Sequence, residues 1–257
     1  MEISITKTGE EEIKSFRILF LEEFNNQFIY DKCHYYNWCD NYLFLIDKKA
    51  VGYGCIWGLN ERNERNAVFE FYLLPTHQKW APLFFEQLIA VPGVTKIECQ
   101  SNDRLLSELV YRYGQNINAE AILFEEYFQT SLSVPGTIFR KRIDSDFKIN
   151  EGDGPYILEN NGVLVAHGGL MLNYNLPYAD IYMHVLEAHR QKGYGSLLVQ
   201  ELKKLAYETE RVPAARCNIK NNISKATIEK AGMRVCGFIL VGDVKKGSDT
   251  TSEKASK

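Results

Sequence analysis

The sequence predicts an α/β protein, in which the strands of a mixed sheet alternate with helices. Residues 179–185 are rich in β-branched and aromatic residues, and a glycine-containing turn and an amphipathic helix follow them. Residues 156–169 predict a strand, a turn and a second strand, and residues 41–54 have the same form. The order of elements in the second half therefore recurs in the first half, which indicates two similar domains.

The first half continues with a weaker version of the same succession. Residues 67–74 predict a strand that parallels residues 179–185, and residues 83–89 predict an apolar helix. Between them, residues 77–80 stand where residues 189–194 stand in the second half, but Trp80 and Pro82 occupy the region and no glycine does. The sequence therefore predicts that only the second copy has the glycine turn.

The chain divides near residues 131–136, where proline and glycine interrupt the pattern. We expect a degenerate N-terminal domain over residues 1–132 and a second domain over residues 136–246. Residues 247–257 are polar, lack aromatic side chains and are expected to form a disordered tail.

The composition is that of an ordinary globular enzyme. The 257 residues are 45% hydrophobic and 25% charged, with a net charge of −3, which does not favour a dedicated nucleic-acid binder. No apolar run is long enough to span a bilayer and the N-terminus lacks a signal-peptide pattern, so we expect a cytoplasmic protein that needs no membrane. The six cysteines are scattered without a C-x-x-C pair, which favours reduced thiols over disulfides or zinc ligands.

The turn Arg190-Gln191-Lys192-Gly193-Tyr194-Gly195-Ser196 is the most informative motif. It opens a predicted helix, whose first amides have no intrahelical partner and whose dipole places about half a positive charge at that end. Gly193 and Gly195 lack a Cβ, so an anion can approach the backbone closely, and Arg190 and Lys192 add positive charge. The motif predicts a phosphate site; the alternative is a basic loop with two turn glycines.

The spacing R-x-x-G-x-G is neither a P-loop nor a dinucleotide fingerprint. It resembles motif A, [R/Q]-x-x-G-x-[G/A], of the GNAT superfamily of acyl-CoA-dependent N-acyltransferases. Residues 221–233 are similar to a second family segment, N-x-x-[S/A] followed by a helix that ends in E-K-x-G-[F/M]. The resemblance covers about residues 156–242. It implies a GNAT-like fold, a central mixed β-sheet flanked by helices, and the internal repeat makes this two such domains in tandem.

The resemblance also implies a site for acetyl-CoA, in a gap where two parallel strands splay apart. The pantetheine arm would pair with the strand that ends at Val185, whose N–H would face the thioester oxygen, and the pyrophosphate would bind the amides of the turn. Asn221 would reach the pantetheine arm; helix capping is the compatible alternative for Asn221 and Ser224. The expected cofactor-binding residues are Met183, Val185, Arg190, Gln191, Lys192, Gly193, Tyr194, Gly195, Ser196, Asn221 and Ser224, and no metal is expected.

An amine must lose a proton during acyl transfer, so the site needs a base or a water relay. Asp180, Tyr182, His184 and Glu187 lie on or beside the predicted cofactor strand. His184 and Asp180 are the predicted catalytic residues, and His184 is favoured because histidine exchanges protons near neutral pH. His167 is expected to be a packing or loop residue.

The family often has a tyrosine before E-K-x-G that protonates the departing thiolate, and Ile228 stands at that position. Three explanations stay open: Tyr207 or another tyrosine replaces it, the thiolate leaves without an acid, or the chain binds acyl-CoA without turnover. The function we expect is an N-acetyltransferase that acts on a small primary amine by direct attack in a ternary complex. The alternatives are a non-catalytic acyl-CoA-binding module and an aminoacyl transferase of tandem GNAT fold.

Overall fold

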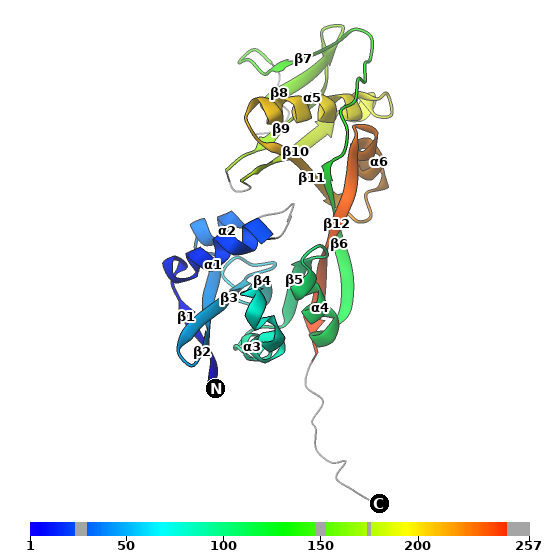
Figure 1. The fold of residues 1–257 in the computed structure, drawn as a ribbon. Coiled ribbons are helices and arrows are strands. Elements are labelled where there is room, and N and C mark those ends of the chain that lie inside the picture. The colour runs from blue at the N-terminus through cyan, green and yellow to red at the C-terminus, as the bar shows by residue number, and fades with distance from the viewer. Residues whose placement is uncertain (24–29, 147–152, 174–175, 246–257) are drawn as a thin grey trace, which may run out of the picture. The chain divides into compact units, whose positions relative to one another are not determined.

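The computed structural model describes residues 1–23, 30–146, 153–173 and 176–245 (Figure 1). The chain forms two compact units, and the predicted tail 247–257 lies outside the described residues. Unit 1 consists of Met1–Phe24, Tyr36–Asn118 and Leu240–Lys257, and unit 2 consists of Asn25–Tyr35 and Ala119–Ile239. Among the described residues, no helix combines the length and the apolar character that a membrane span requires.

Unit 1 carries five strands of its own, of which β1 to β4 pair antiparallel in chain order and β4 pairs parallel with β5. Helices α1, α3 and α4 accompany this sheet. The elements are β1 (Ile3–Thr8), α1 (Glu10–Glu23), β2 (Cys39–Ile46), β3 (Lys49–Trp57), β4 (Ala67–Leu73), the 3-10 helix η1 (Pro75–Trp80), α3 (Ala81–Ile89), β5 (Lys96–Gln100) and α4 (Arg104–Tyr113).

Unit 2 repeats this succession. Strands β7 to β10 pair antiparallel in chain order, and β10 pairs parallel with β11. The elements are α2 (Asp31–Tyr35), β7 (Thr137–Lys141), β8 (Tyr156–Asn160), β9 (Val163–Met171), β10 (Tyr178–Val185), the 3-10 helix η2 (Glu187–His189), α5 (Tyr194–Glu208), β11 (Val212–Asn218) and α6 (Asn222–Lys230). The prediction of a mixed sheet with flanking helices, present twice, is confirmed.

Two long strands, β6 (Gly114–Glu126) and β12 (Met233–Val244), contribute to both units. In unit 2 the strand beside β11 is β6, with residues 121–125 paired antiparallel to residues 214–218. In unit 1 the strand beside β5 is β12, and the Val244 N–H donates to the Thr95 carbonyl at 2.8 Å. Each sheet is therefore completed by a strand from the other half of the chain. The compact units differ for this reason from the expected domains 1–132 and 136–246.

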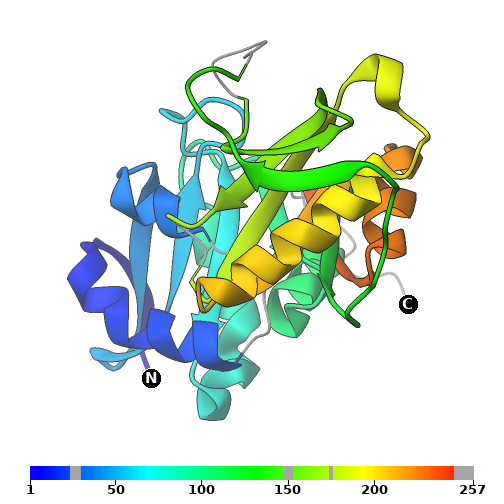
Figure 2. The ribbon, with the colours of Figure 1, turned by 90° about the horizontal axis from the view of Figure 1, so that it is seen from above.

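The core of unit 2 lies between one face of its strands and the helices α5 and α6. Figure 2 shows α5, in yellow, lying along that face, and α5 makes contacts with both β9 and β10. Its apolar stripe faces this core, with Leu198 and Leu202 at 0% exposure and Leu205 partly buried. Ile181 from β10 and Ile228 from α6 pack into the same cluster. Burial of this stripe holds the first turn of α5 against the end of β10, where the predicted cofactor motif lies.

Candidate active site

The site begins where the pairing between β10 and β11 ends. The parallel register joins residues 178–180 to residues 212–214, whereas β10 continues to Val185 and β11 to Asn218. On its other edge, β10 stays paired with β9 as far as Val185. The last five residues of β10, 181–185, therefore pair with β9 along one edge. Among the described residues, their other edge, which faces the side of β11, has no partner strand.

The direction of the Val185 amide follows from its neighbour. The Leu186 N–H donates to the Val165 carbonyl of β9 at 3.0 Å. Because successive amides of a strand point to opposite edges, the Val185 N–H points away from β9, toward the side of β11. The Met183 N–H points the same way. These are the two backbone groups that the sequence predicts for contact with the cofactor.

The turn after β10 ends in a left-handed residue that starts α5. Gly193 is the N-cap residue with φ of 86°, and Gln191 also has a positive φ of 61°. The first helical bond runs from the Leu197 N–H to the Gly193 carbonyl at 3.1 Å, and no side-chain cap closes this end among the described residues. The amides of Tyr194, Gly195 and Ser196 therefore emerge at the N-terminus of a helix of 15 residues, which suits an anion.

The two glycines of the turn serve different purposes. A Cβ on Gly193 would meet only Val134 at 3.6 Å, so its requirement is conformational, set by the positive φ. A Cβ on Gly195 would approach Thr227 Cγ2 to 2.9 Å and Val185 Cγ2 to 3.4 Å. Gly195 therefore allows α5 to approach α6 closely, a packing role that the sequence motif does not reveal.

The basic and polar side chains of the motif are held by local contacts. Arg190 Nε donates to the Val185 carbonyl at 3.4 Å, and Lys192 Nζ donates to the Ala188 carbonyl at 3.2 Å. Both side chains are exposed, so exchanging these bonds for a phosphate costs little. Ser196 Oγ donates to the Thr227 carbonyl at 3.0 Å, which leaves its amide as the group available to an anion.

Asn221 caps α6, as the alternative interpretation predicts. Its Oδ1 accepts a hydrogen bond from the Ser224 N–H at 3.0 Å. Asn221 is exposed and Ser224 is partly exposed. The capping bond uses the side-chain oxygen of Asn221, so its amide nitrogen can donate elsewhere.

The two predicted catalytic residues lie on the same face of β10, four positions apart. His184 is exposed and lies at the unpaired end of the strand. Asp180 is only 3% exposed, lies at the paired end and forms an ion pair with Arg216 at 3.5 Å. Four residues of strand span about 13 Å, so the two groups do not act on one proton. Tyr182 lies between them, and burial raises the pKa of its phenol.

His167, expected to be a packing or loop residue, lies beside His184 and makes polar contacts of its own. The two histidines are direct partners in the β9–β10 register, with ring centroids 5.3 Å apart and ring planes at 29°. His167 Nδ1 accepts from the Gly154 N–H at 3.2 Å, and its Nε2 lies 3.3 Å from Asp153 Oδ1. Arg142 Nη2 lies 3.9 Å from the other oxygen of Asp153. Only the strand register could have revealed this cluster, since residues 153, 167 and 184 are distant in the sequence.

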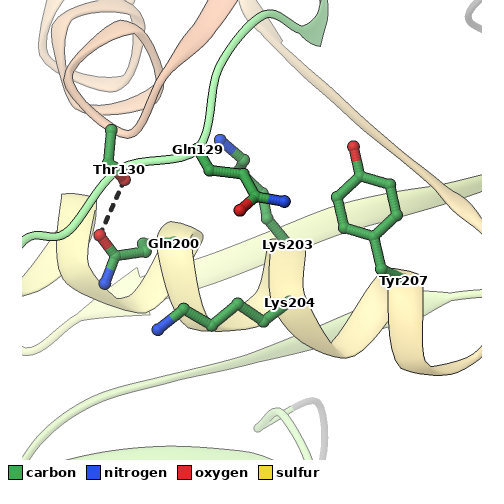
Figure 3. A pocket seen from close by; sticks show the side chains of 6 residues that line it. All are labelled: Gln129, Thr130, Gln200, Lys203, Lys204 and Tyr207. Carbon is green, nitrogen blue, oxygen red and sulfur yellow. Dashed lines mark hydrogen bonds between the residues drawn. The ribbon is translucent and has the colours of Figure 1, made fainter.

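Tyr207, proposed as a substitute acid, lies at the other end of α5. It lines a small pocket together with side chains from α5 and from the segment after β6 (Figure 3). Just beyond it, the Val212 N–H donates to the Pro177 carbonyl at 3.0 Å, which places the end of α5 beside the start of β10. The unpaired end of β10 is the opposite end of that strand. Tyr207 is therefore remote from the predicted thioester position.

The same pocket holds a buried lysine whose contacts are all within the fold. Lys203 is 3% exposed, and its Nζ donates to the carbonyls of Phe128 at 2.9 Å and Ala231 at 2.6 Å. Its third partner is Glu126 at 2.9 Å; burial raises the pKa of this carboxyl and the lysine opposes that rise. Lys203 thus closes the end of α6 and joins it to α5, which is a structural role. The pocket lining consists of Gln129, Thr130, Gln200, Lys203, Lys204 and Tyr207, with Thr130 bonded to Gln200.

Fold and site together define a GNAT-type domain: an antiparallel sheet, a parallel strand pair that separates, and a helix that begins at a glycine turn. The sequence of residues 120–233 matches the acetyltransferase (GNAT) family. That family transfers acyl groups from acyl-CoA. No curated protein matches this chain in sequence.

Solved structures share the fold over most or nearly all of the chain. An acetyltransferase of the GNAT family from Colwellia psychrerythraea has a TM-score of 0.73 at 15% identity, covering 95% of this chain and 100% of that one. A tandem GNAT protein from the clavulanic acid biosynthesis pathway has a TM-score of 0.59 at 10% identity, with coverages of 96% and 100%. A GCN5-related N-acetyltransferase from Sphaerobacter thermophilus has a TM-score of 0.52 at 14% identity, with coverages of 81% and 82%. At these identities the likeness establishes the fold alone.

Proposed function

We propose that this protein is an N-acetyltransferase, which transfers the acetyl group of acetyl-CoA to a primary amine of a small molecule. The observation that carries the proposal is the combination at the end of β10. Strand pairing with β11 stops at Asp180, the Val185 amide points to the same side, and α5 begins five residues after η2 with an uncapped first turn. The unpaired strand edge and its amide suit the pantetheine arm and the thioester, and the start of α5 suits the pyrophosphate.

The residues present fit acyl-CoA. The amides of Tyr194, Gly195 and Ser196 would bind the pyrophosphate, and Arg190 and Lys192 would exchange their local backbone bonds for phosphate oxygens. Met183 and Val185 would pair with the pantetheine arm through their backbone. The Val185 N–H would stabilise the oxyanion, and one such preorganised donor contributes about 3 kcal/mol.

The reaction balances with one base. The amine nitrogen attacks the thioester carbonyl carbon and forms the new C–N bond, while the C–S bond breaks and its electron pair leaves with sulfur as the CoA thiolate. The proton that the amine loses passes to His184, directly or through one water. His184 suits this role because it is exposed at the unpaired end of β10, whereas Asp180 is buried and paired with Arg216.

We propose further that no side chain protonates the thiolate. Ile228 is 5% exposed and packs in the core of unit 2, so its position serves packing. Tyr207 lies at the far end of α5, beside the start of β10. Thiols of ordinary acidity, with a pKa of about 8.5, leave as thiolates without a strong acid.

The test combines calorimetry with product analysis. Acetyl-CoA titrated into the whole protein should bind, and a mass-spectrometric screen of small primary amines should yield at least one acetylated product. Binding with no product across amines of varied size and charge would favour the non-catalytic acyl-CoA-binding module, which the isoleucine at position 228 also supports. Absence of binding would refute both.

A further inference from the structure

We propose that His167 is a positioning residue for His184, held in one tautomer by Asp153 and Gly154 so that its ring is a fixed, uncharged platform. The inference rests on the proposed function, because it assigns the group that orients the base. It concerns three residues of unit 2 that lie in sequence of contact: Asp153 contacts His167, and His167 contacts His184. None of them is part of the glycine turn.

The tautomer follows from the two nitrogen contacts of His167. A backbone N–H can only donate, so the Gly154 bond at 3.2 Å makes Nδ1 the acceptor. The proton of the neutral ring is then on Nε2, which faces the Asp153 carboxylate at 3.3 Å. Both nitrogens are engaged, so rotation about the side-chain bonds would break both contacts. The ring plane is therefore fixed.

Burial keeps this ring neutral. The side chain of His167 is 9% exposed, and burial lowers its pKa, opposed by Asp153 and reinforced by His184 and Arg142. The Asp153 charge is itself balanced by Arg142, whose side chain is 5% exposed. A neutral platform matters because a charged ring at 5.3 Å would repel the proton that the base must accept.

The pairing of β9 with β10 fixes the position of His184 relative to the His167 ring. The two residues are opposite each other in the register, and the pair 186/165 two positions away is hydrogen-bonded, so the backbone separation is fixed. Ring contact at 29° then restricts an otherwise exposed side chain to one plane. The other ionisable groups of β10 on this face are Tyr182 and Asp180, the latter paired with Arg216 of β11. Neither shares the direct ring contact of His167.

The experiment separates the ring from its hydrogen bonds. His167→Phe keeps a flat ring opposite His184 but removes both nitrogen contacts, and His167→Ala removes the ring as well. We expect His167→Phe to be less stable than the wild type and to lower kcat by several fold, because the ring contact is kept but its plane is no longer fixed, whereas His167→Ala lowers kcat about 10- to 100-fold. The Kd for acetyl-CoA should stay unchanged in both. His77→Gln, a partly exposed histidine of η1, is the control and should match the wild type.

Two outcomes would overturn the proposal. One is an equal loss of kcat in the phenylalanine and alanine variants, because a purely structural role follows the hydrogen bonds. The other is wild-type kcat in both variants.

Nuclear magnetic resonance of the wild-type protein with labelled histidines tests the same point without turnover. His167 should give the Nε2–H tautomer at neutral pH, and a ring-current shift of His184 should be kept in His167→Phe. A charged or Nδ1–H His167 would overturn the proposal even if no variant could be purified. A protein that transfers no acetyl group but shows both signatures would refute the proposed function while leaving the positioning intact.

Discussion

Strands β3 and β4 of unit 1 and strands β9 and β10 of unit 2 each place two ring side chains directly opposite each other. In unit 1 the pair is Tyr53 and Tyr72, with centroids 6.4 Å apart, and in unit 2 it is His167 and His184 at 5.3 Å. Two residues after Tyr72 and after His184, a leucine with ψ of 139° leads into a short 3-10 helix. The backbone of the two units is therefore alike here, and the chemistry differs.

The tyrosine pair is closed within the core. Both tyrosines are 0% exposed, and their hydroxyls donate to carboxylates, Tyr53 to Glu70 at 2.9 Å and Tyr72 to Glu23 at 2.6 Å. Burial raises the pKa of both phenols, so neither exchanges a proton near neutral pH. In unit 2, His184 is exposed. The comparison teaches that the same register supports a sealed hydrogen-bond network in one unit and an open basic group in the other.

The turns after these strands differ in the same direction. The register between β4 and β5 covers only two pairs, Ala67 with Lys96 and Val68 with Ile97, so early termination of parallel pairing is common to both units. However, α3 begins at a right-handed Trp80 with a proline in its first turn, whereas α5 begins at the left-handed Gly193. Separation of the strands is therefore insufficient; the glycine turn distinguishes the unit with the candidate site.

The largest effect is expected on kcat, in a comparison of His184→Gln with Tyr72→Phe. Loss of the base should lower kcat by about 10²- to 10⁴-fold while the Kd for acetyl-CoA stays near the wild-type value. Tyr72→Phe should leave kcat unchanged and lower the free energy of unfolding by about 1–2 kcal/mol, since it removes one buried hydrogen bond. Steady-state kinetics and urea unfolding measure both. Equal kcat losses in the two variants would remove the distinction between the pairs.

A second comparison concerns the buried charges. Glu70 accepts from Arg17 through two bonds of 3.2 Å, and both side chains are largely buried. Glu70→Gln should lower the free energy of unfolding by about 3–5 kcal/mol, because the arginine loses its counter-charge. Asp180→Asn should cost less, about 1–3 kcal/mol, since Arg216 is 30% exposed and water can solvate it. A larger loss for Asp180→Asn in urea unfolding would contradict this ranking.

Gly193→Glu tests the turn. The side chain would strain a backbone with φ of 86° and place a carboxylate where the phosphate is expected, so the Kd for acetyl-CoA should rise at least about 100-fold by calorimetry. Gly162→Glu is the matched control, with φ of 79° and open space around its Cβ in the β8–β9 turn. It carries the same strain and should bind acetyl-CoA normally. A near-normal Kd for Gly193→Glu would remove the phosphate assignment.

The smallest effect is a pH dependence that belongs to unit 1. Burial raises the pKa of Asp103 to about 7, against the hydrogen bonds from the Leu106 and Leu105 amides. The folded state then keeps a proton that the unfolded chain has lost, so this carboxyl makes stability fall as pH rises from about 4 to about 7. Asp103→Asn keeps the capping oxygen and should remove up to about 2 kcal/mol of that fall. The free energy of unfolding is measured by urea denaturation at each pH. If it changed with pH equally in the wild type and in Asp103→Asn, Asp103 would not hold the proton.

Features set by local chemistry were predictable from the sequence. The strand before the turn, the amphipathic helix and the capping residue Asn221 each depend on residues within a few positions of one another. The contact between His167 and His184 was not predictable, because it depends on a register between strands. The partner of Asp180 and the packing role of Gly195 involve β11 and α6, which lie further along the chain. Long-range contacts therefore distinguish His184 from Asp180 as the proposed base, whereas the local sequence pattern predicts the proposed phosphate turn.

The reciprocal use of β6 and β12 governs how the chain is assembled during synthesis. When the first half leaves the ribosome, β5 lacks its final neighbour, which is made only with residues 240–244. Until then a sheet edge stays open, and such edges promote aggregation. If the two halves of the chain were expressed separately, β5 would lack β12 and β11 would lack β6. The first half, which has no glycine turn, supplies in residues 121–125 of β6 the strand that pairs with β11.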